Sequence, residues 1–191
     1  MKPSTPSALR CALVLSAASM SAALFADTTT TAASSTAVDG ERVSTTETAK
    51  LSRADRTFFE KASKAAMKEV SVSQATVDRL MNPQAKAFAQ MMVSDHSKTN
   101  SELMELAAKK GVMLPAKDDV APKMMEKWSK KTDDLDEDYM EEMVNDHQES
   151  VQLFEKATKS EDAEIAAFAR KTLPTLQHHL TMAKDLKKVL D

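Results

Sequence analysis

The chain has 191 residues, 26 basic and 29 acidic side chains, and a formal net charge of −3 without any block of basic residues. Binding to nucleic acid or to an anionic membrane surface needs a concentrated positive field, so both kinds of partner are disfavoured. Only two glycines stand against many alanines, methionines, lysines and glutamates, a composition that favours helix. The sequence therefore predicts an all-α protein with one domain of ordinary size.

Residues 1–26 have the pattern of a secretory signal peptide. Lys2 and Arg10 supply the positive start, residues 11–25 are apolar or small, and cleavage is expected near Ala26. An uncleaved membrane anchor is the alternative, but the stretch is short and rich in serine and alanine for a membrane-spanning helix. We expect a periplasmic or otherwise exported protein. Its mature part has no cysteine, hence no disulfide and no thiolate metal site.

Residues 27–50 consist mainly of threonine, serine and alanine with scattered charges. They show no apolar periodicity, and a segment that cannot bury apolar surface stays unfolded, so we interpret them as a disordered linker. The folded domain is then expected over residues 51–191. The linker is compatible with association of this domain with the cell envelope, and the sequence does not indicate protein partners.

Four long segments repeat apolar residues at intervals of three and four, the pattern of helices that bury one face. They are predicted over about residues 54–81, 83–110, 134 to the turn at 159–162, and 162–190. The inward positions of the first two are Phe58, Ala62, Ala65, Glu69, Val72, Thr76 and Leu80, then Ala85, Phe88, Met92, His96, Thr99, Leu103 and Leu106. Those of the last two are Met140, Met143, His147, Val151 and Phe154, then Ile165, Phe168, Thr172, Leu176, His179, Ala183 and Leu186.

The connections between these segments predict the topology. Two of them are so short that they allow only antiparallel hairpins. Residues 111–135 form a connection of about 25 residues, in which Gly111 suits a helix cap and a short helix is expected over residues 123–131, after Pro122. A connection of this length can cross a whole bundle, so the second and third long helices should be parallel. The fold predicted is a ferritin-like four-helix bundle with one long crossover that contains a short extra helix, and Pro174 should kink the last helix.

A short repeat links the second and third long segments. The sequence Met-Val-Ser-Asp-His that ends at His96 matches Met-Val-Asn-Asp-His that ends at His147. An aromatic residue stands four positions before each methionine, Phe88 in one copy and Tyr139 in the other. Both histidines fall on inward positions of helices predicted to be parallel, so both should lie near the middle of the bundle.

Two further polar residues belong at about the same level. Folding the first hairpin back near residue 82 places Glu69 opposite His96. Folding the second near residue 160 leaves His179 about 6–9 Å from His147 along the axis, at about 1.5 Å per residue. A buried carboxylate is costly unless it is paired or bound. We therefore predict that Glu69, His96, His147 and His179 meet inside the bundle.

These four side chains are candidate ligands of one transition metal ion. Imidazole and carboxylate suit zinc, copper, iron or nickel, and Asp95 and Asp146 are candidates for orienting imidazoles on neighbouring helices. The alternative is a metal-free structural or interaction bundle in which histidines and Glu69 form a buried hydrogen-bond network. The sequence leaves both open.

Methionines add a copper variant of the metal prediction. Met92 precedes His96 by four residues, as Met143 precedes His147, and Met182 follows His178 by four, so each pair shares a helix face. Thioether with imidazole favours copper, although methionine also simply fills gaps in cores. No strand-turn-helix elbow supports a serine hydrolase, and the acidic run at residues 133–142 lacks the spacing of a calcium loop. An enzymatic activity is not expected.

The residues that carry these features resemble the DUF4142 family of bacterial exported proteins, which are described as periplasmic or outer-membrane. The resemblance rests on residues 88–96, Tyr139 followed by His147, Leu173-Pro174 and His179-Leu180, and extends over about residues 55–190. It implies a ferritin-like helical bundle, export and no assigned activity, and it matches the three inward histidines to histidines that recur in the family. Di-iron proteins need Glu-x-x-His motifs, which are absent here, so no di-iron chemistry is implied.

Overall fold

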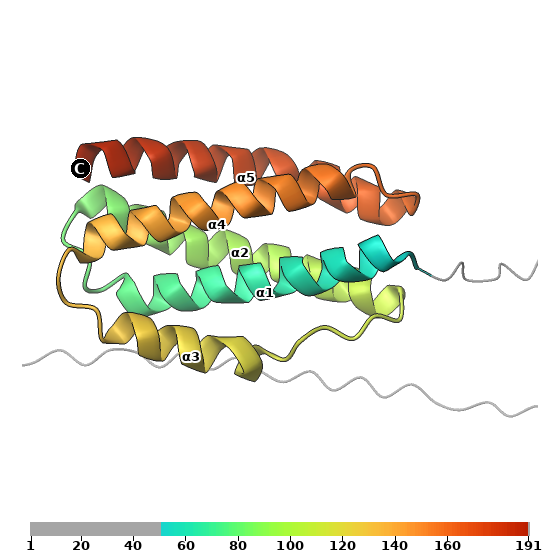
Figure 1. Ribbon diagram of the computed structural model, residues 1–191, viewed down its shortest axis with the longest axis horizontal. Helices are drawn as coiled ribbons and strands as arrows, with labels where there is room; N and C mark the ends of the chain where they lie inside the picture. The colour runs from blue at the N-terminus through green and yellow to red at the C-terminus, as the bar shows by residue number, and fades with distance from the viewer. Residues whose placement is uncertain (1–50, 191) are drawn as a thin grey trace, which may run out of the picture. The chain divides into compact units, whose positions relative to one another are not determined.

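The computed structural model describes residues 51–190, which contain five α-helices. Four long helices form two antiparallel hairpins, α1 with α2 and α4 with α5, and the shorter α3 lies in the crossover between them (Figure 1). The helices are α1 Arg53–Thr76, α2 Pro83–Lys109, α3 Lys117–Ser129, α4 Leu135–Ala157 and α5 Ala163–Leu190. The predicted leader (residues 1–26) and linker (residues 27–50) lie outside the described residues. No helix within the described part is long and apolar enough to cross a membrane.

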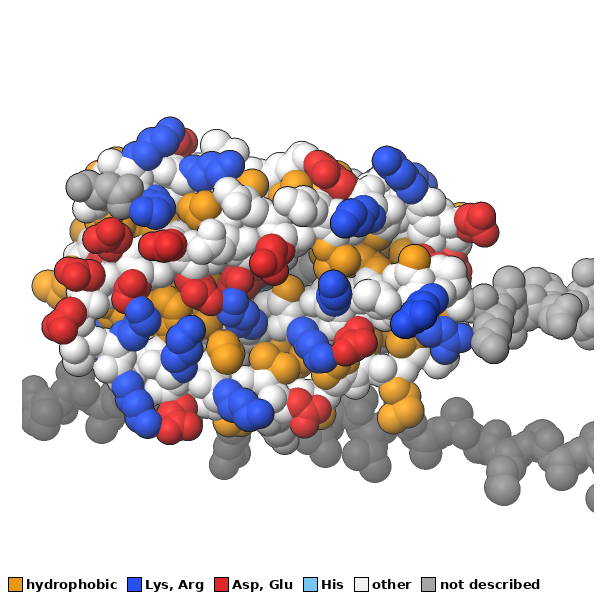
Figure 2. Space-filling view, viewed as in Figure 1, with side chains coloured by type: hydrophobic (Ala, Val, Ile, Leu, Met, Phe, Trp, Pro, Cys, Tyr) orange, Lys and Arg blue, Asp and Glu red, His pale blue; other side chains and the backbone are white. Residues whose placement is uncertain are grey.

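The four long helices pack as the predicted bundle. α1 packs against α2 and α4, and α5 packs against α4 and α2, so the pairs α2/α4 and α1/α5 are diagonal. The crossover runs along the bundle and brings the chain back to the end where α2 began, so α2 and α4 are parallel as predicted (Figure 1). α3 lies along the outer side of α1, on a face where basic and acidic side chains alternate (Figure 2).

The first helix ends five residues earlier than the apolar pattern indicates, at Thr76 instead of Met81. The Thr76 hydroxyl donates to the Val72 carbonyl, and the chain then turns. Met81 and Asn82 donate their backbone N–H groups to the Asp136 carboxylate of α4, both at 2.9 Å. This tertiary contact supplies acceptors for the backbone N–H groups of the turn, so the helix need not extend to Met81. The apolar periodicity of the first helix contains no information about this contact.

The cap predicted at the end of α2 is confirmed. Gly111 has φ = 66°, the left-handed conformation that glycine adopts without strain. The N–H of Val112 returns to the Ala107 carbonyl at 2.9 Å, as in a Schellman motif. The helix therefore stops here, and the crossover begins in the direction of α3.

The predicted crossover helix is present but begins six residues earlier, at Lys117 rather than Lys123. Pro122 lies inside it, in the second turn, where the missing N–H removes one hydrogen bond near the start of the helix. Trp128 anchors this helix: it is 1 % exposed and packs edge-on against Tyr139 of α4. Arg79 donates to the carbonyls of Trp128 and Lys131 and ties the end of α3 to the turn after α1.

The first helix, α1, buries more than one stripe. Besides the predicted inward residues, Phe59, Ala66, Met67 and Val70 are buried, and α1 contacts three other helices, α2, α3 and α4. The apolar periodicity of a helix identifies one buried face well. When a second face is also buried, apolar residues surround more of the helix and the periodicity no longer marks either face.

Apolar side chains form two clusters, one on each side of a polar layer. One cluster contains Phe88, Met92, Trp128, Tyr139 and Met140, and the other contains Phe58, Phe59, Leu103, Phe154 and Phe168. On each long helix the residue between the two clusters is polar: Glu69 on α1, His96 on α2, His147 on α4 and His179 on α5. The two apolar clusters thus hold this layer away from both ends of the bundle.

We expect Trp128→Ala to lower the free energy of unfolding by about 3–5 kcal/mol, because it leaves a large cavity and frees the end of α3. Urea unfolding followed by far-UV circular dichroism measures this, since the substitution removes the single tryptophan. Met125→Ala is the control on the same helix: Met125 is 41 % exposed, and a loss below about 0.5 kcal/mol is expected. Equal losses for both variants would contradict the anchoring role.

Candidate metal centre

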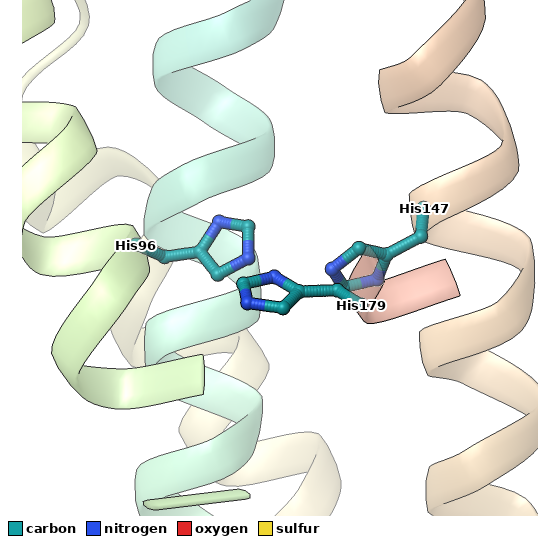
Figure 3. A group of neighbouring side chains, drawn as sticks. All are labelled: His96, His147 and His179. Carbon is teal, nitrogen blue, oxygen red and sulfur yellow. The ribbon is translucent and has the colours of Figure 1, made fainter. Parts of the chain in front are cut away.

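Three buried imidazoles converge in the polar layer. His96, His147 and His179 are 4 %, 0 % and 1 % exposed. Each offers a ring nitrogen, and these three nitrogens all lie within 4.8 Å of one another. The ring centroids are 5.3–5.4 Å apart, close to an equilateral triangle. Figure 3 shows the rings of His96 on α2 and His147 on α4 directed into the bundle, with the His179 ring as the third corner of the triangle. We call these three residues the histidine cluster.

Helix geometry explains how His179 reaches the histidine cluster despite the axial offset expected from the sequence. Every Cα–Cβ bond in a helix tilts toward the N-terminus of that helix. His179 lies farther than His147 from the turn between α4 and α5, and its side chain tilts back toward that turn. His147 tilts away from the same turn, so the two rings approach and their centroids are 5.4 Å apart.

Glu69 lies beside the histidine cluster, as predicted, and is fully buried on α1. Its Oε2 is 2.6 Å from Nδ1 of His96, and its Oε1 is 3.8 Å from Nδ1 of His147. The structure therefore brings all four predicted residues together. The group whose ligand atoms lie within 4.8 Å of one another consists of the three histidines, with Glu69 in contact with two of them.

Each histidine uses one ring nitrogen on the protein and leaves the other free. His96 places Nδ1 against Glu69, His147 Nδ1 lies 2.8 Å from the Met143 carbonyl, and His179 Nε2 lies 3.1 Å from Oδ2 of Asp95. The other three nitrogens, Nε2 of His96, Nε2 of His147 and Nδ1 of His179, are buried and have no hydrogen-bond partner. Buried polar atoms without partners are rare, so these three nitrogens are the ones available to a ligand.

Charge in this layer is concentrated on one pair. Burial disfavours a charged Glu69, but the surrounding imidazoles, His96 first, outweigh it and hold the pKa of Glu69 down at about 2. Burial also disfavours a charged His96, yet the adjacent Glu69 raises the pKa of His96 above its ordinary value. In the metal-free protein these two residues form a buried ion pair.

The other two imidazoles are held neutral. Burial lowers the pKa of His147, against the attraction of Glu69. Burial, with repulsion from His96 and His147, lowers the pKa of His179 to about 4. A neutral imidazole is the form that binds a metal ion, so these two rings need no deprotonation at neutral pH.

The two aspartates of the sequence repeat have different partners. Asp95 lies beside His179 of α5, the contact across helices that the sequence suggested. Asp146 instead contacts Lys68 of α1 at 2.6 Å, and burial raises the pKa of Asp146 to about 6 against the pull of that lysine. Lys68 was not among the predicted site residues. No pattern in the sequence singles it out, because its partners Glu142 and Asp146 lie on another helix.

The methionines predicted to pair with histidines occupy two different environments. Met92 and Met143 are fully buried and belong to the apolar cluster beside the histidine cluster. His178 is exposed, so its pairing with Met182 lies outside the polar layer. The copper variant with thioether ligands therefore rests on Met92 and Met143 alone.

A small chamber adjoins the centre at Glu69 and His96. Its volume is about 10 Å³, close to the minimum for one water molecule. Thr99, Asn100 and Ser150 also line it and supply polar groups. The rest of the chamber's lining is apolar and includes Leu103, Phe154 and Leu176.

Glu69→Gln should lower the pKa of His96 in the metal-free protein by about one unit or more, because it removes the charge that favours the imidazolium. Titration of the imidazole resonances by NMR measures this. Glu142→Gln is the control, since Glu142 contacts Lys68 at 2.6 Å and is one of the carboxylates outside the centre. A His96 pKa that does not change in Glu69→Gln would refute the ion pair.

Comparison with known proteins gives a family and a fold. A family model described as a domain of unknown function, DUF4142, matches residues 40–186. None of the curated proteins matches the sequence. Among solved structures, a DUF305 fragment from Deinococcus radiodurans is similar, with a TM-score of 0.60 and 11 % sequence identity, over 72 % of this chain and 98 % of that one. At this identity the likeness concerns the fold alone.

Proposed function

The chain belongs to the DUF4142 family, whose description assigns no activity, and we propose from the site itself that it binds one transition metal ion through His96, His147 and His179. One observation carries the proposal. Three buried imidazoles from three helices each leave a nitrogen without a partner, and the cluster nitrogens lie within 4.8 Å of one another.

The size of the cluster fits such an ion after a small adjustment. Bonds of about 2.0–2.1 Å to zinc place tetrahedral ligand nitrogens about 3.4 Å apart. The cluster nitrogens lie within 4.8 Å of one another. Rotations of the imidazole rings that move each ligand nitrogen by up to about an ångström close the difference. Zinc, copper and iron all accept imidazole nitrogen, and the three-histidine set does not by itself choose among them.

We assign Glu69 a role different from that of a ligand. Its contact with Nδ1 of His96 leaves Nε2 of that ring for the ion, the arrangement in which a carboxylate orients a metal-binding histidine. Its negative charge also offsets the charge of the ion in a buried layer. Metal binding displaces a proton from His96, so affinity should fall as the pH falls.

The cellular role that follows is metal handling in the cell envelope, by buffering or protection against metal stress. Support for the location comes from the predicted signal peptide, and support for binding rather than catalysis comes from burial of the cluster. A chamber of about 10 Å³ leaves room for a water molecule but not for an organic substrate.

A metal-free bundle is the second candidate, and the Glu69–His96 pair favours it. The two side chains meet at 2.6 Å without any ion, and hydrogen bonds to Met143 and Asp95 hold the other two rings. In this case the polar layer would fix the register of the helices, and the charged surface would carry the interaction with a partner.

Protein purified without a histidine tag and stripped with a chelator should bind one equivalent of Co²⁺ or Zn²⁺. We expect His96→Ala, His147→Ala and His179→Ala each to weaken binding by at least about 100-fold, since each removes a ligand. The visible spectrum of Co²⁺ and competition with a chromophoric chelator measure stoichiometry and affinity. His178→Ala is the matched control, because His178 is the exposed neighbour of His179.

Thermal unfolding separates the two candidates. An ion present at 100 times its Kd stabilises the folded state by about 2.7 kcal/mol, so the melting temperature should rise with added metal and fall with chelator. A melting temperature indifferent to both, with binding well below one equivalent, would leave the metal-free bundle.

A further inference from the structure

Only one of the three groups that hold the imidazole rings reaches solvent. Glu69 is buried, and the Met143 carbonyl lies in the interior of the bundle beside His147. Asp95, which contacts Nε2 of His179 at 3.1 Å, has a side chain 40 % exposed. Its carboxylate therefore touches both water and the histidine cluster.

We propose that Asp95 captures the metal ion at the protein surface and delivers it to the histidine cluster past His179. This inference rests on the proposed function and names the path by which the buried site is loaded. A hydrated cation exchanges its water for protein ligands stepwise, and an exposed carboxylate is a good first partner for a hard or borderline cation.

The repeat supplies an internal comparison for this role. Asp146 is the counterpart of Asp95, one residue before the corresponding histidine. Its side chain is 12 % exposed, and Lys68 neutralises it at 2.6 Å. Lys68 leaves Asp146 with little attraction for a cation, whereas Asp95 lies 3.1 Å from the His179 ring with a side chain 40 % exposed.

A lysine-lined cleft is the alternative approach to the inner chamber. The cleft has a volume of about 630 Å³ and lies between α1 and α4 under α3, and Ala65 and Ser150 line both the cleft and the chamber. Four lysines line the cleft against two acidic residues: Lys61, Lys64, Lys68 and Lys156 against Asp146 and Glu149. Basic side chains are seen over α1 on this face (Figure 2). Lys64 contacts Glu60 at 2.6 Å, and Lys68 contacts Glu142 and Asp146 at the same distance. Lys61 and Lys156 against Glu149 then leave a smaller excess of positive charge to repel an approaching dication.

Stopped-flow measurement of Co²⁺ binding to the full metal-free chain tests the path. Asp95→Asn keeps an acceptor for the His179 ring but removes the charge. We expect the association rate constant to fall about fivefold to tenfold at low ionic strength, with the dissociation rate constant changed less than about twofold. The difference from wild type should shrink in about 0.5 M salt, because screening weakens electrostatic capture. Asp95→Glu keeps the charge and should keep the fast rate.

Two variants make the result specific. Asp146→Asn should leave the association rate unchanged, and so should Lys156→Gln in the lysine-lined cleft. The proposal is overturned if Asp95→Asn acts only through a faster dissociation, which would make Asp95 a positioning residue. It is also overturned if Lys156→Gln speeds association while Asp95→Asn does not. Failure of the proposed function is a separate result, because the wild-type chain would then show no Co²⁺ binding at equilibrium.

Discussion

A carboxylate and three imidazoles are buried in one layer of a helical bundle, and the cost of removing them from water constrains the structure around them. An isolated charge in such a place costs several kcal/mol, so it persists only with a partner. Glu69 and His96 meet this requirement as an ion pair at 2.6 Å, and the pKa values of His147 and His179 are lowered so that both stay neutral. One negative and one positive group then occupy the layer, and the remaining rings contribute uncharged donor atoms.

The hydrogen bonds that satisfy this layer also limit what it can do. Each imidazole is fixed by one nitrogen, which sets its orientation and leaves the other nitrogen directed at no protein group. The proposed metal ion suits three such nitrogens together, because it can accept the lone pair of each imidazole. The two apolar clusters on either side keep water out and hold the helices that carry the rings.

The repeat places similar residues on α2 and α4, but the helices packed against the two copies differ. His96 and His147 occupy equivalent places on the diagonal helices α2 and α4, and each is preceded by an aspartate. One aspartate faces α5 and contacts a histidine of the cluster, while the other faces α1 and contacts Lys68. Two similar sequence motifs thus leave one aspartate 40 % exposed and the other 12 % exposed. The additional packing of α3 on α1 lies on the side of Lys68 and Asp146.

Periodicity, cap residues and connection lengths are local properties, and they predicted the four long helices, the two hairpins, the parallel α2 and α4, and the inward positions of Glu69 and the three histidines. The same local reasoning misplaced the end of α1, because Asp136 holds the turn after Thr76. It misplaced the start of α3 because Pro122, after which the helix was expected to begin, lies inside it. Tertiary structure alone decided which nitrogen of each ring is free, that His179 reaches His147, and that Asp95 and Asp146 have different partners. These depend on side-chain direction and on neighbours contributed by other helices, and a single helix's sequence contains neither.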